Sequence, residues 1–266
     1  SLLLRPSKTK AIIFKPPRSP LYLNIYIHGR SYLPVFINMN HPNQCNITKI
    51  IPINLIPNSD DSSARLLGIY IEDKLNYKDH FRFMHKKITK AVFSLRIMKH
   101  ILDKRHLTLL YNSYLKSNLE YGSALFTTAS KTTINPLFIL QKKAVRIICV
   151  AGYRDHTATL FKDEKLLRFE DIMKFNVCKF MFDYKNNLLP NIFAGTWSTN
   201  SEIHNYPVRN RDDFFIRNTN KNYLKKFPLF QFPIIWNTLP MNLKEIISRK
   251  SFCKELKAHL IDMIET

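Results

Sequence analysis

The sequence predicts an α+β protein in which short antiparallel strands come first and a mainly α-helical region follows. Residues 21–28 alternate apolar and polar side chains, and this period of two is typical of a half-buried strand. From Tyr77 onward the apolar residues recur every three or four positions, which is typical of amphipathic helices. The change of period places the strands in residues 1–76 and the helices in residues 77–266.

The charge of the chain favours a polyanionic partner. The 266 residues include 41 Lys and Arg against 20 Asp and Glu, a formal net charge of +21. Solubility alone is usually served by a net charge of magnitude about 2–8 in a small domain, so nucleic acid is the favoured partner. Hydrophobic residues make up 45% of the chain, a globular share. No apolar run approaches the roughly 18 residues of a membrane-spanning helix, which excludes an integral membrane protein.

The residues themselves predict no catalytic centre and no metal site. Neither G-x-G-x-x-G nor G-x-x-x-x-G-K-[ST] occurs, so nucleotide-binding loops are unsupported. The four cysteines are far apart and form no C-x-x-C pair, which predicts reduced, intracellular thiols. Asp60 and Asp61 are adjacent, as in polymerase metal sites, but Pro, Asn and Ser flank them and predict a solvated loop.

Several short strands are expected before residue 77. The segment 38–63 is rich in Asn, Pro and Ser and predicts a long irregular insertion between them. Pro34 weakens the strand candidate at residues 32–37. The expected strands are residues 11–14, 21–28, 32–37 and 66–71.

The helix expected over residues 81–102 carries a basic face. Between residues 78 and 106 there are nine Lys or Arg and two acids. The cations Lys78, Arg82, Lys86 and Lys90 recur every four residues, with Lys87, Arg96 and Lys99 beside them. Like charges at this spacing destabilise an isolated helix slightly, and a phosphate backbone along the face would offset that. A solvated surface without a ligand is an equally good reading of the pattern.

The four histidines of this region lack the spacing of a zinc-protease helix and are expected to add to the basic face. They are His80, His85, His100 and His106. Residues 187–240 contain repeated prolines and are expected to be loop-like. Further helices are expected over residues 106–118, 134–150, 169–185 and 251–263, the last with Ser251 as its N-cap.

Segments along nearly the whole chain resemble the reverse transcriptases of non-LTR (LINE-type) retrotransposons. Residues 7–14 are similar to the family's S-K-T-K-x-x-I-F segment. Residues 65–80 are similar to F-L-G-I-x-h-D-x-x-L-N-a-x-x-H, where h is apolar and a is aromatic. Residues 140–148 are very like L-Q-K-K-A-I-R-I-I. Weaker likenesses follow in the same order as in the family: 86–88, 110–111, 119–122, 156–161, 188–190, 206–210 and 236–240.

The resemblance implies three regions. Residues 1–76 would be the end of the polymerase palm, residues 77–127 the helical thumb, and residues 128–266 the region after the thumb. Lys8 matches the family's motif D lysine, proposed there to assist proton transfer to the departing pyrophosphate. A primer grip is implied at Leu67, Gly68 and Ile69. Phosphates of a template–primer duplex of RNA and DNA would then face Lys78, Arg82, Lys86, Lys87 and Lys90.

The departures from the family pattern limit the activity expected of this chain. The catalytic aspartates of the family's [FY]-x-D-D hairpin and of an earlier strand are expected N-terminal to Ser1. Only the intact parent polymerase would then use Mg²⁺, and this chain alone would hold no cofactor and synthesise no DNA. The family also implies a nuclear and cytoplasmic location. The alternative is a non-enzymatic basic helical protein that binds nucleic acid, a domesticated or decayed remnant of an element.

Overall fold

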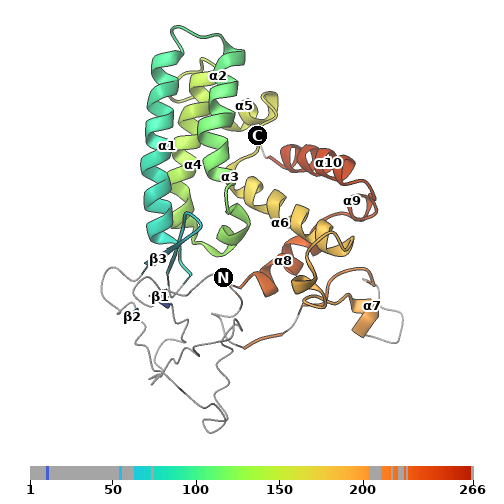
Figure 1. The fold of residues 1–266 in the computed structure, drawn as a ribbon. Helices are drawn as coiled ribbons and strands as arrows, with labels where there is room; N and C mark the ends of the chain where they lie inside the picture. The colour runs from blue at the N-terminus through green and yellow to red at the C-terminus, as the bar shows by residue number, and fades with distance from the viewer. Residues whose placement is uncertain are drawn as a thin grey trace. The chain divides into compact units, whose positions relative to one another are not determined.

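The computed structural model describes residues 10–11, 54–55, 63–72, 75–203, 211–216, 218–220, 225 and 227–264 (Figure 1). Their contacts divide the chain into two compact units, Ser1–Lys74 and Leu75–Thr266. The described part combines small two-stranded sheets with a large helical unit, which is an α+β composition. The strand candidates at 21–28 and 32–37 and the acids Asp60 and Asp61 lie outside the described residues.

The described residues of the first unit form two pairs of short strands. β1 (Lys10–Ala11) pairs with β2 (Asn54–Leu55), and β3 (Ser63–Leu66) pairs with β4 (Ile69–Glu72). The β3–β4 pair is antiparallel, as predicted, with Leu66 opposite Ile69. The β1–β2 pair is parallel, which the prediction of antiparallel strands missed. A long connection separates β1 from β2 in the sequence, and such a length permits parallel pairing.

The prediction of one strand over residues 66–71 is wrong, because a tight turn divides it. Leu67 and Gly68 connect β3 to β4 with φ values of 47° and 86°. Two central residues with positive φ are the signature of the type I′ turn, whose twist matches that of the flanking strands. The apolar run hid this turn, and Gly68 was the signal for it, because glycine adopts positive φ without steric cost.

The second unit begins with helices packed side by side. α1 (Lys78–Met98) packs most extensively against α4 (Lys131–Ile148). Between them in sequence lie α2 (Lys104–Leu110), a π-helix η2 (Tyr111–Lys116), α3 (Ser117–Glu120) and the 3₁₀-helix η3 (Ser123–Thr128). Figure 1 shows α1, α4 and α2 side by side.

The inward faces of these helices follow the predicted spacing. In α1 the apolar side chains at the predicted inward positions are buried as expected, but the helix ends at Met98, which is exposed. The buried ones are Phe81, Met84, Ile88, Ala91, Val92 and Leu95. From α2 to α3 the backbone stays helical, and its buried residues are spaced by four: Leu107, Tyr111, Leu115 and Leu119. A regular α-helix drifts by about 40° over each such step. The wider π turn keeps them on one face.

Later helices form a second group around α6 (Phe169–Lys185), which was predicted with these bounds. α6 packs against η3, α8 (Pro228–Asn237) and α10 (Arg249–Asp262). Shorter helical segments connect these elements: α5 (Thr157–Asp163), η4 (Asn191–Phe193), α7 (Asn200–Ile203) and α9 (Met241–Lys244). The expected N-cap Ser251 is wrong, since α10 begins after Ser248.

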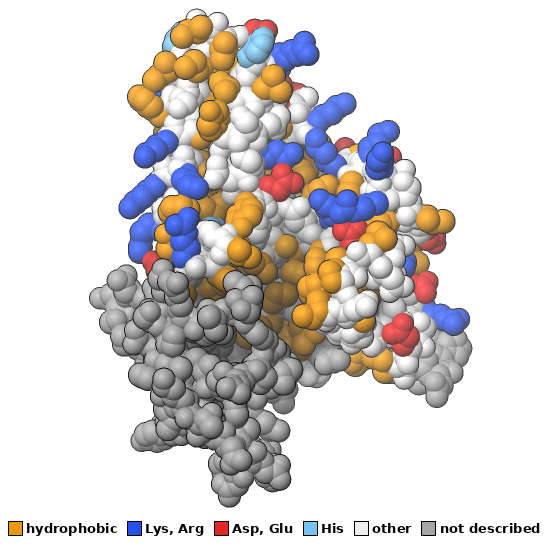
Figure 2. Space-filling view, viewed as in Figure 1, with side chains coloured by type: hydrophobic (Ala, Val, Ile, Leu, Met, Phe, Trp, Pro, Cys, Tyr) orange, Lys and Arg blue, Asp and Glu red, His pale blue; other side chains and the backbone are white. Residues whose placement is uncertain are grey.

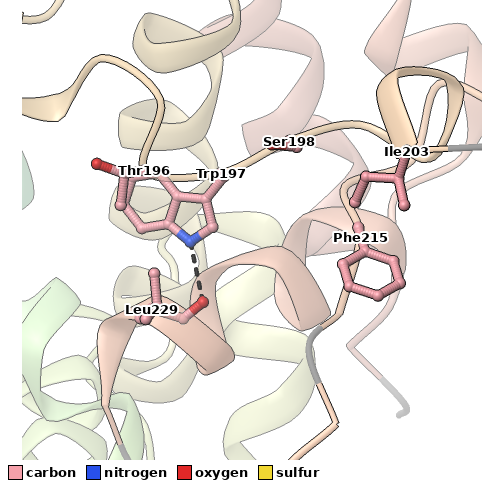
Figure 3. Close-up of a pocket in the computed structure, with 6 residues that line it drawn as sticks. All are labelled: Thr196, Trp197, Ser198, Ile203, Phe215 and Leu229. Atoms are coloured by element: carbon pink, nitrogen blue, oxygen red, sulfur yellow. Dashed lines mark hydrogen bonds between the residues drawn. The ribbon is translucent and has the colours of Figure 1, made fainter.

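The expectation of loop across residues 187–240 is wrong at α8, where proline is compatible with a helix. Pro228 occupies the first turn, where its missing N–H has no intrahelical partner to lose. Pro233 lies inside the helix and therefore leaves the carbonyl of Leu229 without its usual donor. The indole Nε1 of Trp197 donates to that carbonyl oxygen at 2.9 Å (Figure 3). A side chain from another segment thus replaces the missing backbone bond.

A buried glutamine joins the two groups of helices. Gln141 on α4 donates from Nε2 to the hydroxyl of Tyr111 and to the carbonyl of Leu167, both at 2.9 Å. Its Oε1 accepts the backbone N–H of Phe169 at 2.9 Å, at the start of α6. Burial raises the pKa of Tyr111 to about 12, so its hydroxyl stays protonated. The residues before and after position 127 therefore share one interior.

Candidate nucleic-acid interface

The candidate interface is the outer face of α1, opposite the side that packs against α4. Successive residues turn by about 100° around the helix axis, so Arg82, Lys86 and Lys90 form one stripe that winds slowly along the helix. Lys78 begins the stripe and Lys87 borders it. All five cations are exposed, and we call this set the basic face. Figure 2 shows blue side chains along the edge of the molecule that α1 occupies in Figure 1.

The start of α1 is fixed by packing rather than by a side-chain cap. Tyr77 precedes the helix with a left-handed backbone and makes no side-chain cap bond, but its carbonyl accepts the N–H of Phe81 at 2.9 Å. The Tyr77 ring lies edge-on to Phe126 at 5.1 Å. Burial raises the pKa of Tyr77. Asp79 in the first turn complements the positive end of the helix dipole.

Little negative charge opposes the basic face. Arg82 forms an ion pair with Asp79, with 2.9 Å between Nη1 and Oδ1. The Lys87 ammonium lies 4.7 Å from the centre of the Phe83 ring, a cation–π distance that leaves its charge unneutralised. Among the described residues, no carboxylate forms an ion pair with Lys86 or Lys90. This face therefore presents positive charge to solvent.

The prediction that His80 adds to the basic face is wrong. His80 is only 3% exposed, and its ring lies 4.9 Å from that of Phe126. Burial lowers the pKa of His80 to about 4, with a further contribution from the charge of Lys87. The histidine is therefore neutral near pH 7. Its position one turn before Met84, on the inward stripe, explains the burial.

The expected primer-grip residues form the tip of the β3–β4 hairpin. Leu67 is 82% exposed, while Ile69 is buried. The tip therefore exposes the apolar side chain of Leu67 to solvent, while the buried side chain of Ile69 fixes the hairpin next to it. The motif D candidate Lys8 lies outside the described residues.

No family model, curated protein or solved structure matches this chain. The resemblance to retrotransposon reverse transcriptases therefore rests on the sequence segments themselves.

The described residues provide no evident site for a metal or a small cofactor. They contain no group of three or more His, Cys, Asp or Glu side chains that could hold a metal ion. Burial raises the pKa of Cys178 to about 12 and that of Cys149 to about 11, so neither thiol is poised as a nucleophile. Within the same residues, no helix has the length and apolar character needed to cross a membrane.

One small pocket lies beside Trp197 (Figure 3). Its volume is about 80 Å³, whereas pockets for drug-sized ligands are typically about 300–1,000 Å³. It is lined by Thr196, Trp197, Ser198, Ile203, Phe215 and Leu229. A pocket of this size does not accommodate a nucleotide.

Sequence reasoning missed Phe93 and Ile97, which lie on the outer face of α1. Both are exposed, at 61% and 47%. A signal for them exists, because Phe93 follows Lys86 by seven residues and Ile97 follows Lys90 by seven, which places each pair on one side of the helix. The prediction used only the inward apolar spacing.

Proposed function

We propose that this chain is the palm-end, thumb and post-thumb portion of a non-LTR retrotransposon reverse transcriptase. In this role it binds a template–primer duplex and does not polymerise DNA by itself. Segments that resemble the family in the same order along the chain support the proposal, as does the net charge of +21. The observation that carries it is the basic face of α1, where Lys86 and Lys90 have no carboxylate partner among the described residues.

The basic face suits the phosphate backbone rather than the bases. Lysine ammonium groups act as mobile point charges and tolerate any sequence. Each neutralised phosphate releases condensed counterions, so binding through this face depends steeply on salt. In the same proposal the exposed Leu67 at the hairpin tip contacts the primer, and Lys8 assists the departing pyrophosphate in the intact polymerase. The carboxylates that hold Mg²⁺ there would come from outside this chain.

The salt dependence of binding tests the role of the basic face. The probe is an RNA–DNA hybrid with a recessed 3′ end, and fluorescence anisotropy measures its affinity over a series of KCl concentrations. Replacing Lys86, Lys87 and Lys90 with Ala should reduce the slope of log K against log salt by up to about 2.7, about 0.9 for each lost phosphate contact.

A matched control removes the same charge elsewhere. Lys174, Lys250 and Lys254 are exposed lysines on α6 and α10. Their triple replacement with Ala should leave the slope nearly unchanged. If the two triple variants lose the same amount of slope, the basic face is an ordinary solvated surface and not a specific phosphate-binding site. Robust primer extension by this chain with Mg²⁺ would refute the proposed lack of catalysis.

The second candidate is a non-enzymatic basic helical protein that binds nucleic acid. The unit Leu75–Thr266 favours it, because this unit is compact and has its own interior. The two candidates differ in their preference for duplex ends. Tighter binding to a recessed 3′ end than to a blunt duplex favours the reverse-transcriptase portion, and equal binding favours the non-enzymatic protein.

A further inference from the structure

The outer face of α1 changes its chemistry along the helix. Its first turns carry the cations of the basic face, and its last turns carry Phe93 and Ile97. Ile101, in the turn that follows, is 74% exposed and extends the apolar stretch. Figure 2 shows a cluster of apolar side chains at the top of the view, above the blue side chains of the basic face.

The cations and the apolar side chains lie along one line. Residues seven apart in an α-helix differ by about 20° around the axis and by about 10 Å along it. Lys86 and Phe93 form one such pair, and Lys90 and Ile97 form another. A stacked strand advances by about 3.4 Å per nucleotide, so about 10 Å corresponds to about three nucleotides.

The ring of Phe93 is open to a ligand. Its side chain is 61% exposed, and among the described residues no other aromatic ring packs against it. Arg96, one turn further along, places a positive charge beyond the ring. The nearby acids have local partners, since Asp79 forms an ion pair with Arg82 and Asp103 is hydrogen-bonded to His106.

We propose that a single-stranded nucleic acid lies along the outer face of α1, with phosphates at Lys86 and Lys90 and an unpaired base stacked on Phe93. Cations that track a backbone beside exposed aromatic rings are the means by which proteins hold single strands without reading their sequence. This inference rests on the proposed binding of nucleic acid and adds a single-stranded segment to it. An acidic amphipathic peptide is the other polymer that could match both surfaces, but a cationic stripe continued by an open ring fits a strand of alternating phosphates and bases more closely.

The test compares single-stranded and blunt duplex oligonucleotides in anisotropy measurements. Phe93→Ala should weaken single-strand binding by about five- to tenfold, the lower part of the range for base–aromatic stacking. Duplex binding should change by less than about twofold. Phe93→Trp should retain single-strand affinity, and its indole fluorescence should be quenched when the oligonucleotide is added. Tyr153→Ala, at an exposed aromatic residue of another segment, should change neither affinity.

Three outcomes separate this inference from the proposed function. If the unaltered chain binds duplex with a steep salt slope but Phe93→Ala leaves single-strand binding unchanged, the stacking site is refuted and the basic face stands. The same holds if Phe93→Ala weakens both forms equally. If the unaltered chain binds neither form, the proposed function itself is refuted.

Discussion

Replacing the buried glutamine that joins the helices should destabilise the second unit strongly. Gln141→Leu keeps a similar volume but removes three hydrogen bonds, to Tyr111, Leu167 and Phe169. Each buried group left without a partner costs about 1–3 kcal/mol. The added apolar surface of leucine offsets a part of this, so we expect a loss of about 3–5 kcal/mol. Domains of this kind are typically stable by about 5–15 kcal/mol, so the effect is large.

Urea denaturation followed by circular dichroism measures this loss as a shift of the midpoint at an unchanged m-value. Adding Tyr111→Phe to Gln141→Leu should recover about 1 kcal/mol, because the orphaned hydroxyl is removed with its partner. Gln231→Leu is the control, since the side chain of Gln231 makes one bond, to the carbonyl of Lys225. A loss below about 1 kcal/mol for Gln141→Leu, or equal losses at the two glutamines, would refute the reasoning.

Three further predictions concern stability. The folded pKa of His80 is about 4, below its usual 6.5, so the contribution of His80 to stability should be constant above pH 6.5 and fall by about 1.4 kcal/mol per pH unit between 6.5 and 4. Denaturant titrations should find this fall flattened in His80→Leu, and an equal fall in the variant would contradict it. The buried Lys244 pairs with Asp213 at 2.8 Å, so Lys244→Met should cost about 3 kcal/mol in thermal unfolding, and Asp213→Asn added to it should recover a part. If Asp213→Asn recovers no stability, the uncompensated charge of Asp213 is not the cause of the loss. Leu67 has φ 47°, so Leu67→Asn should slow amide hydrogen exchange in β3 and β4, whereas Leu67→Val should accelerate it, and the reverse order would exclude the strained turn.

The sequence predicted those helices whose apolar spacing is regular. The inward spacing from Phe81 to Leu95 identified α1, and the cations between these residues identified its basic face. α8 was missed because Pro228 and Pro233 are typical of breaks, and the sequence shows no sign that Trp197 supplies the missing donor. Compensation of this kind depends on segments brought together only by folding.

The candidate interface was predicted in part for a similar reason. A stripe of like charges is visible in sequence because the spacing alone creates it. The burial of His80 depends on Phe126, which lies far along the chain, and therefore could not be predicted locally. The openness of Phe93 likewise depends on which neighbours fold against it. The role of Lys8 lies outside the described residues and stays a prediction.

The π-helix η2 adds one residue to the continuous helical stretch from α2 to α3. The burial of its inward side chains does not require this extra residue. Tyr111, Leu115 and Leu119 are buried and lie four residues apart, whereas residues on one face of a regular α-helix alternate between spacings of four and three. Deleting the exposed Asn112 or Ser113 would turn the wide turn into an ordinary one and still bury the same side chains. A gap of one residue here in a related sequence would therefore record a change of helix type with no change of fold.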